Sequence, residues 1–226
     1  MIVAEKVCKR YEDSAGDVYP VKGVDLSIPD GRFVSIVGRS GSGKSTLLKM
    51  LGGLLTPTEG IVKIDGDSIY ALSEKEMANY RCNRIGFVFQ DYMLEEKYTV
   101  FQNIEIVLMI AAIEKKHRNR MIEEALNAVG LLSKRNTFVY KLSGGEKQRV
   151  SIARAIVNQP SIIFADEPCG NLDWENGQLI MSLLRKQVDD GRTVVLITHN
   201  LDDAKMTLNV LYAFANKYPD KVKKYL

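Results

Sequence analysis

The order of apolar and polar residues along the chain predicts alternating strands and helices. Three short apolar runs, residues 33–37, 161–165 and 193–198, each follow turn or polar residues and predict buried parallel strands. Helical patterns lie between these runs and include residues 45–55 and 152–158. Because strands alternate with helices, we predict an α/β fold with a mainly parallel sheet.

A different pattern surrounds the first buried strand. Residues 2–11 and 18–28 alternate apolar and polar positions, and residues 60–70 do the same around an Asp65-Gly66 turn. Such alternation is typical of half-exposed strands. We therefore predict an antiparallel β subdomain beside the parallel sheet.

The segment from residue 91 to residue 158 has a mostly helical pattern, which predicts an inserted helical subdomain. We expect one domain over residues 1–226. Its predicted parts are a core with the β subdomain at residues 1–90 and 159–208, the helical subdomain at 91–158, and an atypical C-terminal tail at 209–226.

The composition adds limits to this picture. The chain has 226 residues, of which 46% are hydrophobic and 26% are charged, as in ordinary globular proteins. A net charge of +3 with interspersed signs gives no argument for a nucleic-acid partner. Charges appear from position 5 onward, which excludes the apolar core of a signal peptide. The apolar run at residues 106–113 is far shorter than the ~20 residues of a membrane helix, so we predict a buried helix there.

The cysteines carry no recognisable site. Cys8, Cys82 and Cys169 are odd in number and widely spaced, which fits neither a disulfide framework nor a zinc motif. We interpret them as reduced thiols of a cytoplasmic protein.

Residues 38–45 read G-R-S-G-S-G-K-S and match the P-loop pattern G-x-x-x-x-G-K-[ST]. Glycines allow a tight turn that brings backbone N–H groups to phosphate oxygens. We expect Lys44 to reach the β- and γ-phosphates of a nucleotide and the Ser45 hydroxyl to bind Mg²⁺. A helix predicted to start here points its positive end at the anion. The predicted phosphate-binding residues are Gly38, Arg39, Ser40, Gly41, Ser42, Gly43, Lys44, Ser45 and Thr46.

Ionisable residues follow two further core strands. Asp166 and Glu167 come at the carboxyl end of one strand, where open α/β sheets bind ligands. We predict that Asp166 holds Mg²⁺ and that Glu167 orients and deprotonates an attacking water. His199 follows another strand. A lone histidine is more often structural, but this position favours sensing of the γ-phosphate.

Two further residues have weaker support from the pattern alone. Gln90 follows an apolar run and can ligate Mg²⁺ through its carbonyl, or it is simply a polar strand end. Tyr11 lies in an alternating strand, where it can stack on adenine or pack as an ordinary aromatic residue.

A second glycine-rich stretch, Ser143-Gly144-Gly145-Glu146, fits the capping box S-x-x-E of a helix start. Capping does not exclude a phosphate contact, because a serine hydroxyl both accepts and donates hydrogen bonds. The capping box does not need the glycines, each of which costs about 1 kcal/mol relative to alanine within a helix. We infer that another group approaches this backbone closely. Since this loop lies on a separate helical lobe, we predict that it meets the nucleotide of a second chain, with ATP at a symmetric interface.

In combination these motifs resemble the nucleotide-binding subunit of ABC transporters. GRSGSGKST resembles Walker A, Gln90 lies at the Q-loop, LSGGEKQR resembles the signature, and IIFADE resembles Walker B. GNLD resembles the D-loop, and His199 stands at the H-loop. The resemblance covers roughly residues 1–205. The stretches ADEPCGNLD and FVFQDYMLEEKYTVFQNIE look most like the branch that serves lipoprotein release, macrolide or antimicrobial-peptide efflux, and the related cell-division pair.

The resemblance implies a P-loop NTPase core and an ATPase that uses ATP and Mg²⁺. It implies a head-to-tail dimer in which Ser143 and Gly145 contact the γ-phosphate of the partner's ATP. It also implies that Tyr11 stacks on adenine and that Asp173 communicates across the interface. Binding of ATP would close the dimer and hydrolysis would open it.

The resemblance further implies a separate membrane permease that docks near Gln90 and the helical lobe. The chain would then be cytoplasmic and peripheral on the inner face of the cell membrane. A rival hypothesis is a mechanotransmitting ATPase that regulates a cell-wall enzyme through a permease-like partner without transport. A soluble ABC ATPase acting on DNA or ribosomes would usually carry a long coiled-coil insertion or a second cassette, and a small-molecule kinase has no use for the signature.

The end of the chain departs from the family pattern. Beyond residue 206 the family continues with an Asp-Arg pair, a strand and an Asp-Gly turn into a final strand, whereas this chain reads TLNVLYAFANKYPDKVKKYL. Residues 209–214 fit a strand or a helix, and residues 220–226 resemble a solvated basic tail. We therefore expect the closing hairpin to be missing or replaced.

Overall fold

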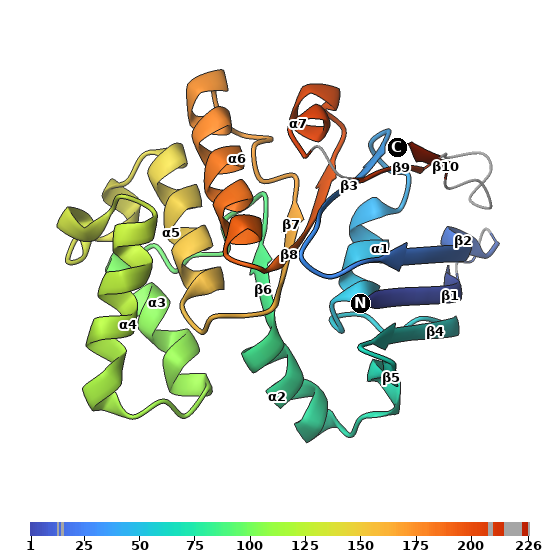
Figure 1. Cartoon of the computed structure of the whole chain (residues 1–226), viewed down its shortest axis with the longest axis horizontal. Helices are drawn as coiled ribbons and strands as arrows, with labels where there is room; N and C mark the ends of the chain where they lie inside the picture. The colour runs from blue at the N-terminus through green and yellow to red at the C-terminus, as the bar shows by residue number, and fades with distance from the viewer. Residues whose placement is uncertain (13, 15, 208–209, 215–222, 226) are drawn as a thin grey trace. The chain divides into compact units, whose positions relative to one another are not determined.

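The computed structural model describes residues 1–12, 14, 16–207, 210–214 and 223–225. The chain divides into two compact units, each described here by itself. The β-rich unit comprises Met1–Ala78 and Thr193–Leu226, and the helix-rich unit comprises Asn79–Arg192. Figure 1 labels the elements of both.

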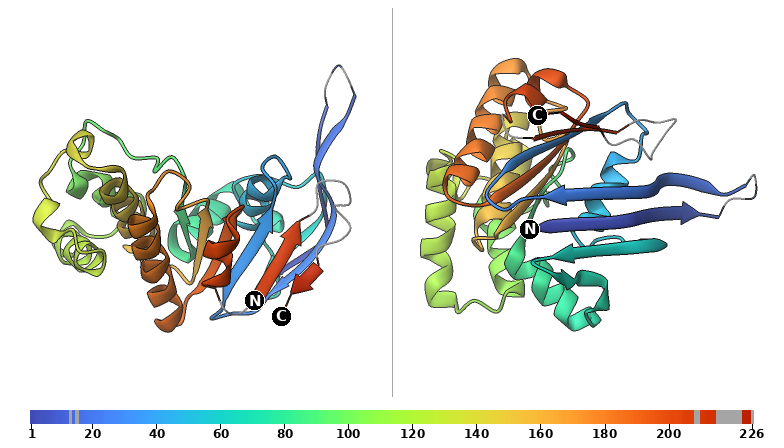
Figure 2. Two further views of the ribbon diagram at one scale, coloured as in Figure 1. Left: turned by 90° about the horizontal axis from the view of Figure 1, so that it is seen from above. Right: turned by 45° about the vertical axis from the view of Figure 1, so that its right-hand side comes forward.

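An antiparallel sheet forms the N-terminal part of the β-rich unit. It contains β1 (Ile2–Tyr11), β2 (Val18–Ile28), β4 (Glu59–Ile64) and β5 (Asp67–Ser68), in the order β2-β1-β4-β5. Ile2 pairs with Ile28 on one side and with Ile64 on the other, and all three side chains are buried. Figure 2 shows β1, β2 and β4 side by side. The predicted antiparallel sheet is therefore confirmed.

Parallel strands form the other sheet of this unit. They are β3 (Phe33–Gly38), β8 (Thr193–Thr198) and β9 (Val210–Phe214), joined by the antiparallel strand β10 (Lys223–Tyr225) in the order β10-β9-β3-β8. Every residue of β8 is buried, as its unbroken apolar run predicts. The helices of this unit are η1 (Ile69–Ala71), α1 (Lys44–Leu51) and α7 (Leu201–Lys205).

The C-terminal prediction needs correction. The sequence pattern indicated a basic tail and left residues 209–214 open between strand and helix. Residues 210–214 form strand β9, which pairs in parallel with β3, so the strand alternative is confirmed. The correction concerns the expected basic tail, because its residues 223–225 form β10 and pair antiparallel with β9. The rest of the predicted tail lies outside the described residues.

The helix-rich unit combines a short parallel strand pair with long helices. Its strands are β6 (Ile85–Val88) and β7 (Ile162–Asp166), and the unit boundary falls within α2 (Glu74–Arg84). The helices of the unit are α3 (Val100–Ile110), α4 (Lys115–Ala128), η2 (Leu132–Lys134), η3 (Val139–Lys141), α5 (Gly144–Ile156) and α6 (Trp174–Asp189). Helices α3, α4 and α5 pack against one another (Figure 1).

One helix is less buried than predicted. Helix α3 was expected to be buried, and it does bury Val100, Ile104 and Leu108. Its last turns nevertheless expose Met109 by 54% and Ile110 by 74%. The reason is that only one face of α3 meets α4 and α5. Within the described part of the chain, no helix is long and apolar enough to cross a membrane.

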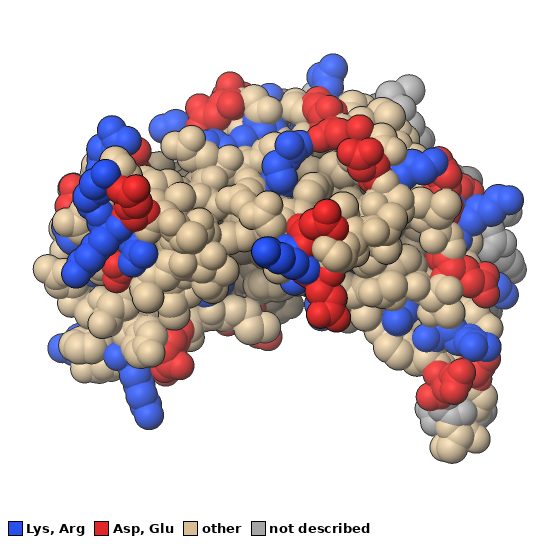
Figure 3. Space-filling view, turned by 90° about the horizontal axis from the view of Figure 1, so that it is seen from below, with Lys and Arg blue, Asp and Glu red and all other residues tan. Residues whose placement is uncertain are grey.

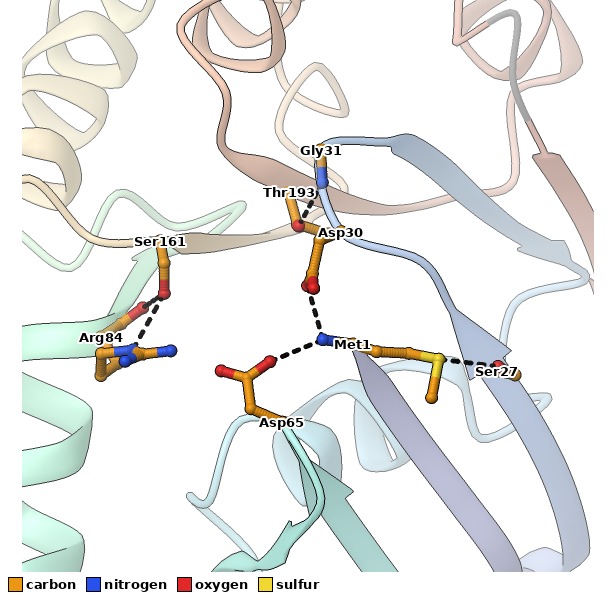
Figure 4. A network of polar contacts seen from close by, with 8 residues as sticks. All are labelled: Met1, Ser27, Asp30, Gly31, Asp65, Arg84, Ser161 and Thr193. Carbon is orange, nitrogen blue, oxygen red and sulfur yellow. Dashed lines mark hydrogen bonds and ion pairs between the residues drawn. The ribbon is translucent and has the colours of Figure 1, made fainter.

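Polar contacts tie the strand ends together within each unit (Figure 4). In the β-rich unit the N-terminal amine donates to carboxylate oxygens of Asp30 and Asp65, both at 2.6 Å. The Gly31 N–H donates to the Thr193 hydroxyl at 3.0 Å and so fixes the turn before β3 against the start of β8. In the helix-rich unit Arg84 donates to the Ser161 hydroxyl and links the starts of β6 and β7.

Charged side chains of opposite sign are interspersed on the face drawn in Figure 3. Ion pairs of the helix-rich unit include Arg118 with Glu105 at 3.7 Å and Lys147 with Glu96 at 2.7 Å. This surface agrees with the interspersed charges of the sequence and its net charge of +3.

Candidate nucleotide site

The P-loop connects β3 to α1 in the β-rich unit. Gly41 and Gly43 have φ of 75° and 93°, a left-handed conformation that favours glycine. A Cβ atom on Gly43 would lie 1.9 Å from the Pro20 carbonyl oxygen on β2. Any side chain at position 43 would therefore displace either the loop or the strand beside it.

Buried polar groups line this loop. Lys44 is only 5% exposed, and its ammonium donates to the carbonyl oxygens of Gly38 at 2.8 Å and Arg39 at 3.1 Å. Ser42 is 6% exposed, and its hydroxyl has no hydrogen-bond partner among the described residues. The first turn of α1 contains no acidic residue. A buried cation, an unpaired hydroxyl and a helix N-terminus fit a phosphate group.

His199 and Tyr11 belong to the same unit as the P-loop. Val37 of β3 pairs with Thr198 of β8, so His199 comes next to Gly38 at the carboxyl edge of the sheet. The His199 side chain is exposed at that edge. Tyr11 ends β1 with 46% of its surface exposed, and the Lys9 ammonium lies 5.4 Å from the centre of its ring.

Gln90 and Glu167 lie at a common sheet edge in the helix-rich unit. Val88 of β6 pairs with Ala165 of β7. Gln90 and Glu167 each come two positions after these paired residues. Gln90 and Asn171 exchange two weak side-chain contacts, Gln90 Nε2 to Asn171 Oδ1 at 3.5 Å and Asn171 Nδ2 to Gln90 O at 3.4 Å. Glu167 has φ of 47°, a left-handed value that is uncommon for a non-glycine residue.

The predicted magnesium ligands divide between the two units. Ser45 is in the β-rich unit, whereas Gln90 and Asp166 are in the helix-rich unit at the ends of β6 and β7. A serine hydroxyl, an amide carbonyl and a carboxylate are oxygen donors of the kind that Mg²⁺ prefers.

The predicted capping box is confirmed at the start of α5. The Glu146 N–H donates to the Ser143 hydroxyl at 3.2 Å, and the Ser143 N–H donates to the Glu146 carboxylate at 2.9 Å. This backbone hydrogen bond, together with Lys134 at 3.3 Å, lowers the pKa of the Glu146 carboxyl below its ordinary value.

The two glycines of this stretch have close neighbours within their own chain. A Cβ atom on Gly145 would lie 2.3 Å from the side-chain oxygen of Asn176 in α6. A Cβ atom on Gly144 would lie 3.0 Å from the Tyr92 hydroxyl. The sequence pattern ascribed the glycines to an approaching phosphate alone, but packing within the helix-rich unit already requires a small residue at position 145.

Two side chains of α5 form hydrogen bonds to the neighbouring loops. The sequence pattern did not predict either of them. Gln148 is fully buried and donates to the carbonyl oxygens of Pro168 at 2.8 Å and Phe89 at 3.4 Å. Arg154 donates to the carbonyl oxygens of Tyr92 and Met93, which both have positive φ. Nothing in the local pattern of α5 marks these residues, because their partners lie tens of positions away in the sequence.

A groove of about 350 Å³ opens beside these residues in the helix-rich unit. Arg81, Arg154 and Asn158 contribute its polar groups. Its apolar wall comes from β6, the following loop and α3: Ile85, Phe87, Phe89, Met93, Ile106 and Val107. Exposed apolar surface of this kind is typical of a protein interaction site.

Comparison with known proteins gives one consistent result. The family model described as ABC transporter matches residues 21–170. An ABC transporter ATP-binding protein of Thermotoga maritima is 43% identical over 87% of this chain and 84% of its own length. The lipoprotein-releasing system ATP-binding protein LolD of Aquifex aeolicus is 42% identical over 92% of this chain and 89% of its own length.

Solved structures give the same result. The dimeric structure of MJ0796, titled a bacterial ABC transporter cassette, is 40% identical and covers 96% of this chain and 95% of its own, with a TM-score of 0.88. A dimeric post-hydrolysis state of the same cassette, bound to ADP and Pi, is 38% identical and covers 100% of this chain and 98% of its own, with a TM-score of 0.90.

Proposed function

This chain belongs to the ABC transporter family, and on that premise we propose that it is the ATPase subunit that drives a separate membrane permease. That it is an ABC ATPase follows from the family and from the ADP- and Pi-bound cassette to which it is similar. The P-loop is the observation that supports nucleotide binding most directly. Its Lys44 is buried, its Ser42 hydroxyl has no partner among the described residues, and its backbone at Gly43 lies too close to Pro20 for a side chain.

We propose the following roles for the residues of one chain. Lys44 and the backbone N–H groups of residues 38–46 bind the phosphates of ATP. Glu167 accepts a proton from the attacking water, and His199, which follows the strand paired with β3, contacts the γ-phosphate. Tyr11, exposed at the end of β1, stacks on the adenine. Ser45, Asp166 and the Gln90 carbonyl would hold Mg²⁺, which would neutralise phosphate charge when bound.

The second half of each site comes from a second copy of the chain. Residues 143–146 begin α5 with a capped, glycine-containing turn, and the positive end of that helix suits an anion. We propose that this turn binds the γ-phosphate held by the partner's P-loop. The dimeric state of the similar MJ0796 cassette supports this arrangement.

Two variants test these assignments. Glu167→Gln should bind ATP, dimerise in size-exclusion chromatography with light scattering, and lose about 10²–10⁴-fold in turnover, because general-base help is removed. Normal turnover would refute the role of Glu167.

Ser143→Arg should bind ATP with unchanged affinity yet remain monomeric, because the arginine occupies the position of the γ-phosphate. Dimerisation of Ser143→Arg would refute the contact in trans.

We further propose that the permease is an exporter or a lipoprotein or antimicrobial-peptide transporter, and that it docks in the groove between β6 and α3. The LolD relatives support the transporter class, and the apolar wall of the groove supports the location. The chain would then lie on the inner face of the cell membrane, held by its partner.

The docking proposal has a matched pair of variants. Ile106 lines the groove and Met109 does not, although both are exposed side chains of α3. Membranes should retain Glu167→Gln protein with ATP and release it when Ile106→Lys is added. Met109→Lys should be retained. Equal retention of the two lysine variants would exclude this groove as the docking site.

A further inference from the structure

The single tryptophan of the chain has an unusual position. Trp174 is the first residue of α6 and is 76% exposed, more than any other large apolar side chain among the described residues. Tryptophan is on average a strongly buried residue. An indole that is exposed in the single chain is therefore a candidate for contact with another protein surface.

The start of α6 holds Trp174 in place. Asp173 is the N-cap residue, and its carboxylate accepts from the Asn176 N–H and from the Asn176 side-chain amide, both at 2.8 Å. These two hydrogen bonds lower the pKa of Asp173 below its ordinary value. The backbone around the indole is thus ordered without any partner, so little entropy is lost when the indole binds.

Trp174 also lies beside the turn that we assign to the partner's γ-phosphate. Residues on both sides of it contact that turn. Asn176 lies against Gly145, and Leu172 lies 3.7 Å from a Cβ atom placed on Gly144. The indole and residues 143–146 therefore belong to one end of the helix-rich unit.

We propose that Trp174 packs against the second copy of the chain when two cassettes close on ATP. This rests on the proposed function, because a turn that meets the partner's γ-phosphate brings the adjacent residues to the partner's surface. Tryptophan is, with tyrosine and arginine, among the residue types enriched at energetically dominant interface positions. A second copy is favoured over the permease because the groove assigned to the permease contains no residue of α6.

Intrinsic fluorescence gives a direct test, since Trp174 is the only tryptophan. The Glu167→Gln protein is titrated with Mg²⁺ and ATP while light scattering reports the dimer. Emission should shift to the blue, and iodide quenching should fall several-fold, in step with dimer formation. Ser143→Arg, which we expect to bind ATP as a monomer, should show neither change.

Variants test the energetic contribution. Trp174→Ala should weaken ATP-dependent dimerisation of Glu167→Gln by about tenfold or more, as expected for an interface anchor. Trp174→Phe should retain most of the affinity. Ile110→Ala, which removes a side chain exposed by 74% on α3, should leave dimerisation unchanged. Circular dichroism establishes that each variant is folded.

The outcomes separate this inference from the proposed function. If Glu167→Gln dimerises with ATP while the indole stays fully quenchable, or if Trp174→Ala dimerises like its parent, the Trp174 contact is wrong and the ATP-closed dimer stands. If no dimer forms with ATP, both proposals fail.

Discussion

Replacing Gly145 with alanine should disturb α6 rather than α5. Gly145 is buried within the first turn of α5, and its φ is not in the left-handed region. The added methyl group would lie 2.3 Å from Oδ1 and 2.6 Å from Cγ of Asn176, well inside van der Waals contact. The Asn176 side chain must then move away from its position against α5, while the alanine itself fits the helical backbone.

The structure allows the size of this effect to be estimated. If Asn176 moves, its amide loses the 2.8 Å hydrogen bond to the exposed Asp173 carboxylate, and the added methyl group crowds a packed contact, which typically costs about 1–3 kcal/mol. Alanine in place of glycine in a helix regains up to about 1 kcal/mol. Gly145→Ala should therefore lower the free energy of unfolding by up to about 2 kcal/mol, the difference between these two contributions.

A double-mutant cycle with Asn176→Ala isolates the contact. Once Asn176 is truncated, the alanine at position 145 meets no amide, and Gly145→Ala should become neutral or stabilising by up to about 1 kcal/mol. Gly177→Ala in α6 is the matched control, because its Cβ atom would lie 3.7 Å from Cys169, an ordinary contact. Urea unfolding followed by circular dichroism measures the four proteins of the cycle and the Gly177→Ala control.

The sign change in the Asn176→Ala background is the decisive result. If Gly145→Ala destabilises both backgrounds equally, the contact with Asn176 is not the cause and the reasoning fails. ATP turnover adds a second comparison. If the double variant regains stability but not turnover, while Asn176→Ala alone keeps its turnover, a glycine at position 145 is needed for the nucleotide as well as for packing.

Three further changes have expected results. Gly43→Ala should abolish ATP binding in a fluorescent-nucleotide titration, because its Cβ atom would lie 1.9 Å from the Pro20 carbonyl oxygen; retained affinity would refute a rigid cradle. Gln148→Leu leaves two backbone carbonyl groups without their donor and should cost about 1–3 kcal/mol in urea unfolding, whereas a neutral result would refute the role of Gln148 as a link. The lowered pKa of Glu146 stabilises the fold above its unfolded-state pKa, and this contribution is lost as the pH falls through the folded-state pKa. The difference in unfolding free energy between the parent and Glu146→Gln should therefore shrink from pH 7 to pH 3, and a constant difference would contradict the capping interaction.

The sequence predicted those elements whose signal is local. The runs that became β3, β7 and β8 are mostly apolar and do not alternate with polar residues, because both faces of each strand are covered. Helix α2 was not predicted, since Met77 is its only buried residue and its pattern is almost uniformly polar. The closing strands were predicted only in part, with residues 209–214 left open between strand and helix and β10 not predicted, because the residues that form them carry neither a clear period nor the expected Asp-Gly turn.

The candidate site likewise contains parts with a local sequence signal and parts without one. The P-loop and the capping box are contiguous in sequence, so their residue types alone predict them. The groups that support them are not contiguous. Gln148 donates hydrogen bonds to Phe89 and Pro168, which lie 59 and 20 positions away in the sequence. Asn176 lies against Gly145, which is 31 positions earlier. No period or short motif encodes such contacts, and a single sequence offers no signal that would have found them.

Helix α5 gives a physical reason why these supporting contacts matter for function. Its first turn is the proposed γ-phosphate contact, and its later turns carry Gln148 and Arg154, which bond to backbone carbonyls of residues 89–93. Two residues of that loop, Phe89 and Met93, also line the groove proposed for the permease. One helix therefore contacts both of the proposed surfaces, and all these contacts lie within one compact unit. A displacement of the α5 N-terminus by the partner's nucleotide would reach the groove through bonded groups, so variants of Gln148 and Arg154 should weaken the dependence of permease binding on ATP more than they weaken ATP binding itself.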